Sequence, residues 1–182
     1  MIIWIASYPK SGNTWVRSFL TAYYFCENGI FNINKLNLIE DYPNKQFFKE
    51  KVKQGEIHKH WETSQKEIRD QKKVKFLKTH NSLITAFGND FTKPEYSLGV
   101  IYVIRDPRNV ITSVKNHNDL DSYDEALKFM QDENKVLEDY PHLKNYAKTN
   151  IINSWRINYR SWLGNKSLRR VTIRYEDMVK NP

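Results

Sequence analysis

Hydrophobic residues along the chain gather in four short runs, which are separated by longer stretches with helical spacing. The runs are Ile2–Ala6, Val74–Leu77, Gly99–Ile104 and Arg170–Arg174, and the best of them are rich in Ile, Val, Tyr and Leu. Continuous apolar runs of this length are typical of parallel strands that are covered on both faces. The pattern therefore predicts four buried strands.

The stretches between these runs predict helices. Large apolar side chains recur at helical spacing from Thr14 to about Asn28. Strands that alternate with helices predict an α/β fold, with a mainly parallel sheet and flanking helices. Because the 182 residues contain no linker or repeat, we expect one domain over residues 1–182. The other predicted helices are Glu56–Lys73, Pro107–Asn116, Ser122–Glu138 and Asn145–Leu163, with Pro141 as a break between the last two.

Composition and charge narrow the class of protein. The single cysteine, Cys26, excludes an intrachain disulfide, and its apolar helical surroundings indicate a packed thiol. The first apolar run is too short for a transmembrane segment and lacks the basic start of a signal peptide, so we expect a cytoplasmic protein. The net charge of +8 fits an anionic partner of some kind. We interpret the lysine clusters at Lys45–Lys53 and Lys66–Lys75 as solvated helix faces, so no nucleic acid is expected as a partner.

The most informative motif, Tyr-Pro-Lys-Ser-Gly-Asn-Thr-Trp at residues 8–15, lies between the first predicted strand and helix. Open α/β sheets bind ligands at such positions. Gly12 allows close approach to the backbone, the amides after it form an anion site at a helix N-terminus, and Lys10 adds a positive charge. The alternative is a structural corner that carries a lysine. The motif is not a Walker A motif, in which the lysine follows the second glycine.

Two further strand ends carry candidate chemistry. Lys78 and His80 are two residues apart at the end of the second strand, so both can face one pocket, where they suit charge stabilisation and general-base catalysis. Arg105 ends the third strand, and Ser113 follows within two helical turns, a pair that can grip a phosphate. The alternatives are a surface histidine, an ion pair between Arg105 and Asp106, and a serine that simply fills its helix.

In combination these motifs resemble the sulfotransferase family of the cytosolic and bacterial type. The family's 5′-phosphosulfate loop, Tyr-Pro-Lys-Ser-Gly-Thr-Thr-Trp, differs from this sequence only at Asn13. The resemblance implies a fold related to P-loop nucleotide kinases. Four further motifs of the family are matched. Its Lys-Thr-His corresponds to residues 78–80, and its 3′-phosphate motif with a later serine corresponds to residues 105–110 with Ser113. Its paired tryptophans correspond to Trp155 and Trp162, and its Tyr-Glu-Asp-Met segment corresponds to residues 175–178.

The resemblance also implies roles for individual residues, with 3′-phosphoadenosine-5′-phosphosulfate as co-substrate and no metal. Lys10 would contact the phosphosulfate bridge, His80 would take a proton from the acceptor, and Lys78 would lie beside the sulfuryl oxygens. Asn13 replaces a threonine at a position that works mainly through its backbone amide, so little loss is expected. The nucleotide-binding positions would be Lys10, Ser11, Gly12, Asn13, Thr14, Trp15, Arg105, Ser113 and Tyr175.

The implied reaction is transfer of a sulfuryl group to a hydroxyl or amine of a small-molecule, lipid or sugar acceptor. Two poorly patterned segments, Phe31–Pro43 and Ser82–Tyr96, are candidates for binding it. The family continues past the position of Pro182 with a basic segment over the nucleotide. Relative to the family we therefore expect a C-terminally incomplete domain, with weak nucleotide binding and little transfer by these residues alone. The alternatives are a small-molecule kinase of related fold and a non-catalytic module that binds adenosine phosphates or nucleic acid.

Overall fold

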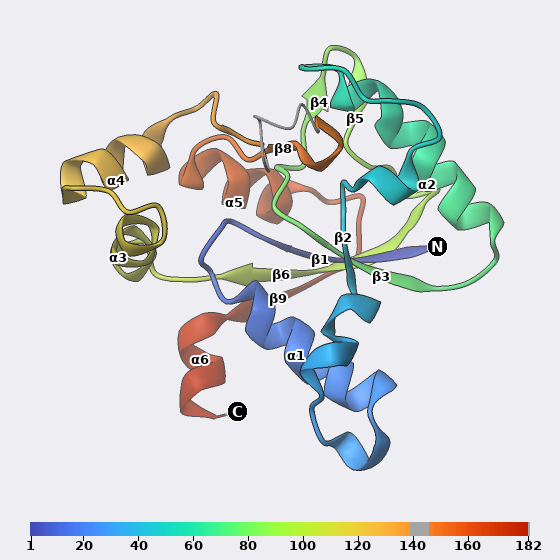
Figure 1. The fold of residues 1–182 in the computed structure, drawn as a ribbon, viewed down its shortest axis with the longest axis horizontal. Helices are drawn as coiled ribbons and strands as arrows, with labels where there is room; N and C mark the ends of the chain where they lie inside the picture. The colour runs from blue at the N-terminus through green and yellow to red at the C-terminus, as the bar shows by residue number, and fades with distance from the viewer. Residues whose placement is uncertain (139–145, 182) are drawn as a thin grey trace.

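The computed structural model of the protein describes residues 1–138 and 146–181. Its centre is a five-stranded sheet in the order β2–β3–β1–β6–β9 (Figure 1). Every pairing within this sheet is parallel, so the predicted α/β fold with a mainly parallel sheet is confirmed. The strands are β1 (Ile2–Ser7), β2 (Glu40–Asp41), β3 (Lys75–Thr79), β6 (Ser97–Ile104) and β9 (Arg170–Arg174).

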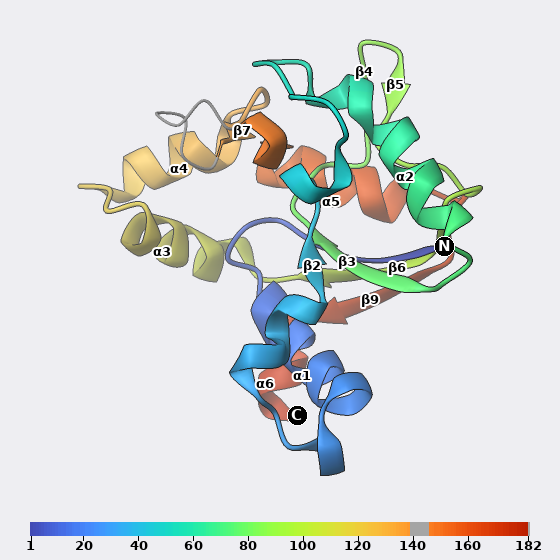
Figure 2. The same cartoon turned by 45° about the vertical axis from the view of Figure 1, so that its right-hand side comes forward.

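Helices cover both faces of the sheet, as Figure 1 and the turned view in Figure 2 show. On one face, Trp4 of β1 shares a buried cluster with Trp61 and Trp162, which belong to α2 (Trp61–Asp70) and α5 (Trp155–Gly164). On the other face, Ile5 packs with Val16 and Met178, from α1 (Asn13–Phe25) and α6 (Tyr175–Lys180). Alternation along a buried strand therefore divides the core into two layers.

Two more helices, α3 (Pro107–His117) and α4 (Tyr123–Gln131), lie beyond the carboxyl end of β6 (Figure 1). Val110 and Val114 of α3 pack with Ala126 and Met130 of α4 and with Tyr8 of the loop after β1. The helices thereby form a wall beside that loop. The smaller elements are two antiparallel pairs and several short 3-10 helices. The pairs are β4 (Thr85–Ala86) with β5 (Asn89–Asp90) and β7 (Val136–Leu137) with β8 (Asn150–Ile151).

Some predicted boundaries were wrong. The helix expected from Glu56 begins at Trp61, because Ile57–His60 form a 3-10 helix. The helix expected to reach Glu138 ends at Gln131, because residues 136 and 137 pair as β7. The Lys45–Lys53 cluster is largely outside helices.

The helix predicted from Asn145 begins at Trp155, where the Ser154 hydroxyl caps it by accepting from the Ile157 amide. Asn145 itself and the predicted break at Pro141 lie outside the described residues. β2 and α6 were not predicted as elements.

Candidate active site

The loop between β1 and α1 forms the first part of the site. Lys10 and Gly12 both have left-handed backbone conformations, with φ angles of 64° and 96°. Gly12 precedes α1, and no side chain caps this end of the helix. The Trp15 amide donates to the Gly12 carbonyl at 3.0 Å. The amides of Asn13 and Thr14 come before it, at a helix start where no intrahelical acceptor is within reach, so they suit an anion. The loop therefore has a shape that suits an anion, and its role as the predicted anion site stays a prediction.

A glycine is required at position 12 for two reasons. The φ angle of 96° is one that residues with a Cβ rarely adopt. A Cβ at Gly12 would also lie 2.3 Å from Cδ2 of Tyr175, because the tyrosine ring, at the start of α6, lies against the loop. The fold thus places Tyr175, near the end of the described residues, against the loop of residues 8–12 near the start of the chain.

The side chain of Arg105 contacts the loop after β1, helix α3 and Tyr175. Its Nη1 donates to the carbonyl oxygen of Lys10 at 3.0 Å and to Oγ of Ser113 at 3.1 Å. Its guanidinium lies over the ring of Tyr175, 4.4 Å from the ring centroid. The ion pair with Asp106 that was the alternative for Arg105 is absent among the described contacts, since Asp106 pairs with Arg108 and accepts its amide.

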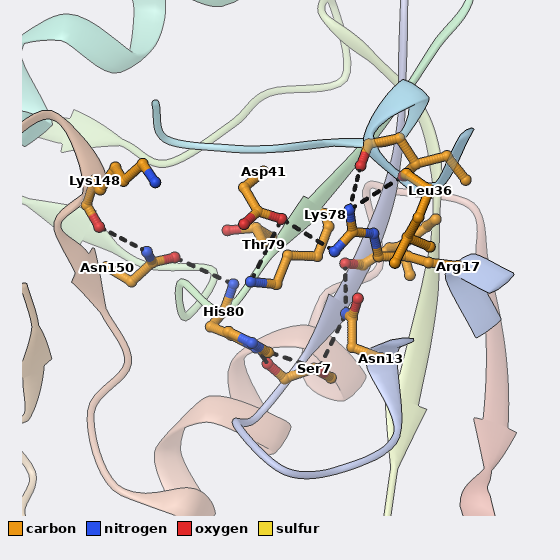
Figure 3. Close-up of polar contacts among 12 residues, drawn as sticks. Ser7, Asn13, Arg17, Leu36, Asp41, Lys78, Thr79, His80, Lys148 and Asn150 are labelled. Carbon is orange, nitrogen blue, oxygen red and sulfur yellow. Dashed lines mark hydrogen bonds and ion pairs between the residues drawn. The ribbon is translucent and has the colours of Figure 1, made fainter. Parts of the chain in front are cut away.

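His80 follows β3 and is held from several sides (Figure 3). Its Nδ1 is 2.7 Å from the carbonyl oxygen of Ser7 and 3.3 Å from Oγ of the same residue. A carbonyl can only accept, so Nδ1 carries the hydrogen and Nε2 is left with its lone pair. Burial, and next the positive charge of Lys78, hold the pKa of His80 well below its usual range. The imidazole is therefore neutral near pH 7 and able to accept a proton.

Lys78 lies beside an acidic side chain that sequence reasoning did not single out. Its Nζ is 3.6 Å from Oδ1 of Asp41 on β2, and Nη1 of Arg17 is 3.3 Å from the same oxygen (Figure 3). Arg17 also donates to the carbonyl oxygens of Leu36 and Ile39. Two cations thus share one carboxylate near His80. The hydrophobic pattern of the first predicted helix gave no signal for Arg17, whose side chain is buried in the structure.

Asn13 has a role that differs from the expected one. Its side chain is buried, and Nδ2 donates to the carbonyl oxygen of Ile5 at 3.0 Å and to Oγ of Ser7 at 3.1 Å. The Asn13 side chain therefore fastens the loop to β1, next to the Ser7 hydroxyl that contacts His80. The expected role of its backbone amide stays a prediction.

One cleft of about 700 Å³ brings most of the predicted residues together. Ser11, which belongs to the loop after β1, is buried and does not line the cleft. Trp15 is half-exposed and lines a separate apolar groove beside α1 and α6. The predicted site residues that line the cleft are Lys10, Gly12, Asn13, Thr14, Lys78, His80, Arg105, Ser113 and Tyr175.

The cleft has further walls that were not predicted. Val114 and His117 of α3, Phe129 of α4 and Leu137 with Glu138 also line it. Over residues 1–138 and 146–181, no group of three His, Cys, Asp or Glu side chains could hold a metal ion. In the same residues, no helix is long and apolar enough to cross a membrane.

Comparison with solved structures supports the fold. Retinol dehydratase in complex with retinol and PAP superposes with a TM-score of 0.55 at 16% identity, covering 99% of this chain and 56% of that one. The same enzyme with androsterone and the inactive cofactor PAP gives 0.55 at 14% identity, covering 99% and 55%. This chain thus spans little more than half the length of these structures.

Of the two sequence comparisons, the one with family models finds a match and the one with individual curated proteins does not. Among curated proteins there is no significant match. The family model of the sulfotransferase domain, in contrast, matches residues 2–182. That range includes the loop after β1, the strand ends that carry His80 and Arg105, and Tyr175. The chain belongs to the sulfotransferase family.

Proposed function

We propose that this chain transfers a sulfuryl group from 3′-phosphoadenosine-5′-phosphosulfate to a hydroxyl or amine acceptor. The observation that carries the proposal is the guanidinium of Arg105, which bonds both Ser113 and the loop carbonyl of Lys10 in the cleft that contains His80. A nucleotide with phosphates at its 5′ and 3′ positions needs two anion sites. The amides that begin α1 are suited to the first, and Arg105 with Ser113 to the second.

The residues present fit such a donor. Ser11 Oγ and Arg105 Nε are buried without a hydrogen-bond partner among the described residues, and buried polar atoms are seldom left so. Both belong to segments that we assign to phosphate binding. Tyr175, whose ring lies against the loop at Gly12, is assigned to the adenine. On the resemblance to the family alone, we assign Trp15 to the same base.

The donor supplies an activated sulfur atom, and transfer breaks its bond to the bridging phosphate oxygen while the acceptor oxygen or nitrogen bonds to sulfur. Nε2 of His80 takes the acceptor proton, and the bond from Nδ1 to Ser7 keeps the ring in the required tautomer. Lys10 neutralises the charge that develops on the leaving oxygen. Lys78 stabilises the charge on the sulfuryl oxygens.

For the acceptor we propose a small molecule that includes an apolar part. Val114, Phe129 and Leu137 give the cleft an apolar wall. Retinol and androsterone, the compounds bound to the two solved structures, are apolar alcohols. Lipids and sugars that carry a hydroxyl near such a part belong to the same class, and they are the first acceptors to screen.

Two measurements test this proposal. Calorimetric titration should show that 3′-phosphoadenosine-5′-phosphate (PAP) binds more tightly than ADP, because only the former occupies both anion sites. Incubation with radiolabelled donor and a panel of alcohols and amines should transfer label to an acceptor. Equal affinity for PAP and ADP would contradict the assignment of Arg105 and Ser113. Tight binding of ATP with transfer of its γ-phosphate would instead identify a kinase.

A further inference from the structure

The segment that carries His80 is held by side chains from a distant part of the chain. His80 and the three residues after it follow the end of β3. The His80 amide donates to Oδ1 of Asn150 at 3.2 Å (Figure 3). The Leu83 amide donates to Oγ of Ser161, and the Asn81 carbonyl accepts from Nε1 of Trp162, both at 2.9 Å. The backbone around His80 is therefore fixed mainly from β8 and α5.

Asn158 of α5 lies at the centre of this arrangement and is fully buried. Its Nδ2 donates to the carbonyl oxygen of His80 at 3.0 Å and to that of Ile152 at 3.0 Å. Its Oδ1 accepts from the hydroxyl of Tyr102, on β6, at 2.9 Å. The reversed amide would place an oxygen against two carbonyl oxygens, so these contacts fix the orientation of the carboxamide.

These contacts, together with those made by Ser7, restrain His80 at both ends. Asn158 and Asn150 hold its carbonyl and its amide, which places the Cα atom, and the Ser7 carbonyl then holds Nδ1 of the ring. A general base must stand within hydrogen-bond reach of the proton that it removes, and small displacements are costly. Loss of the hold on the backbone would let the ring move away from its bond to Ser7.

We infer that Asn158 is a positioning residue for His80, oriented by Tyr102. It sets the place of the proposed base without touching the substrate, and thereby keeps the ring at the Ser7 carbonyl that fixes its tautomer. The inference rests on the proposed function in one respect, namely that His80 acts as the base. The competing explanation is that Asn158 only stabilises the core. A core residue would affect folding and nucleotide binding together, whereas a positioning residue affects turnover and leaves nucleotide binding unchanged.

The test compares Asn158→Ala with a matched variant, Asn165→Ala. Asn165, at the end of the same helix, accepts from the amides of Ser167 and Leu168 and has no contact with His80. Asn158→Ala should lower kcat roughly tenfold to a hundredfold and change Kd for PAP by less than about twofold. Asn165→Ala should lower Tm and leave kcat unchanged. Parallel losses of kcat and PAP affinity in Asn158→Ala, or an unchanged kcat, would overturn the inference.

A readout that needs no turnover separates this inference from the proposed function. Nitrogen chemical shifts of the His80 ring report which nitrogen is protonated. The unaltered protein should show protonated Nδ1 alone, and Asn158→Ala should show a mixture of tautomers. This expectation stands even if no sulfuryl transfer is found. An unmixed Nδ1 tautomer in the variant would overturn the positioning role.

If Asn158→Ala does not fold, Tyr102→Phe carries the test. This change removes the hydroxyl that orients the carboxamide and that also bonds to the backbone of Tyr8, and it retains the ring that stacks on Trp162. We expect a smaller fall in kcat, roughly threefold to tenfold, with unchanged PAP affinity and the same mixing of tautomers. A Tyr102→Phe protein with the original kcat and a single tautomer would overturn the inference.

Discussion

The two ends of the cleft are built in opposite ways. At the end that holds His80, Ser7, Asn150 and Asn158 occupy the ring nitrogen, the amide and the carbonyl of one residue. At the end that holds the loop after β1, the helix start at Gly12 has no side-chain cap. The first end is complete before any ligand arrives, whereas the second leaves backbone donors for one.

This difference matches what each end must do in the proposed reaction. A base acts on a proton at one position, so its place is best fixed in advance. An anion site exchanges its ligand in every cycle, and donors that were already paired would have to be freed each time. Replacing a residue at the His80 end should therefore alter turnover, and replacing one at the end with the loop after β1 should alter nucleotide binding.

His80→Ala should produce the largest effect on turnover, and it should separate turnover from PAP affinity most clearly. Removing a general base lowers turnover by roughly a hundredfold to ten-thousandfold. PAP affinity should change by less than about twofold, because the ring lies outside the proposed anion sites. Rapid-quench assays and calorimetry provide the two numbers. His60→Ala serves as a control, since His60 lies away from the cleft, and a variant at position 80 that turned over at the original rate would refute the assignment.

Arg105→Ala should affect the opposite end. A buried charge-assisted hydrogen bond contributes about 1.5–3 kcal/mol, so the preference for PAP over ADP should shrink roughly tenfold to a hundredfold. Affinity for ADP should fall by less than affinity for PAP, because ADP loses only the support that Arg105 gives to the loop and to Tyr175. Arg108→Ala is the matched control, because that side chain is highly exposed and pairs with Asp106. An undiminished preference in Arg105→Ala would place the 3′-phosphate elsewhere.

Gly12→Ala tests the shape of the loop. Gly12 and Gly55 both have positive φ, 96° and 73°, but an added Cβ meets Tyr175 at position 12 and nothing within 4 Å at position 55. Both alanine variants should lose about 1–2 kcal/mol of folding stability to backbone strain. Only Gly12→Ala should also weaken PAP binding, by roughly tenfold, since Tyr175 must move. Equal PAP affinity in the two variants would show that the contact with Tyr175 is unimportant.

The smallest expected effect concerns pH. Burial and Lys78 lower the pKa of His80, so the neutral base persists when pH falls from 7.5 to the ordinary histidine value of about 6.5. With an alcohol acceptor, kcat/KM should change by less than about twofold over that interval. The unfolded chain binds a proton more readily, so the contribution of this group to stability is lost only as pH falls below about 6.5. A steep fall in kcat/KM already between pH 7.5 and 6.5 would contradict the lowered pKa.

The sequence predicted best what depends on local pattern. Buried parallel strands are continuous apolar runs, so β1, β3, β6 and β9 were found, and their carboxyl ends placed Lys10, His80 and Arg105 at one edge. β2 was missed because its two residues, Glu40 and Asp41, are acidic and pair through their backbone. A hydrophobic pattern carries no signal for such a strand.

The less predictable part of the site consists of contacts between distant polar residues. Asn13 was expected to act through its backbone, yet its side chain reaches into β1. Asn158 resembles any other polar residue on a helix until Tyr102 and His80 are found beside it. Hydrogen bonds between segments far apart in sequence depend on how the helices pack on the sheet. The hydrophobic pattern of the sequence does not predict such bonds. The roles predicted for individual residues remain for the variants above to decide.

The central place of β1 has a consequence for how the protein reaches its working state. Its neighbours in the sheet, β3 and β6, come from residues 75–79 and 97–104, so pairing must await chain that is synthesised much later. The contact between His80 and Ser7 spans 73 residues, and that between Arg105 and Lys10 spans 95. Native structure dominated by such long-range pairings forms slowly. During synthesis the loop after β1 therefore lacks its contacts until the chain that includes His80 and Arg105 has been made. We expect nucleotide affinity to appear abruptly, late in folding.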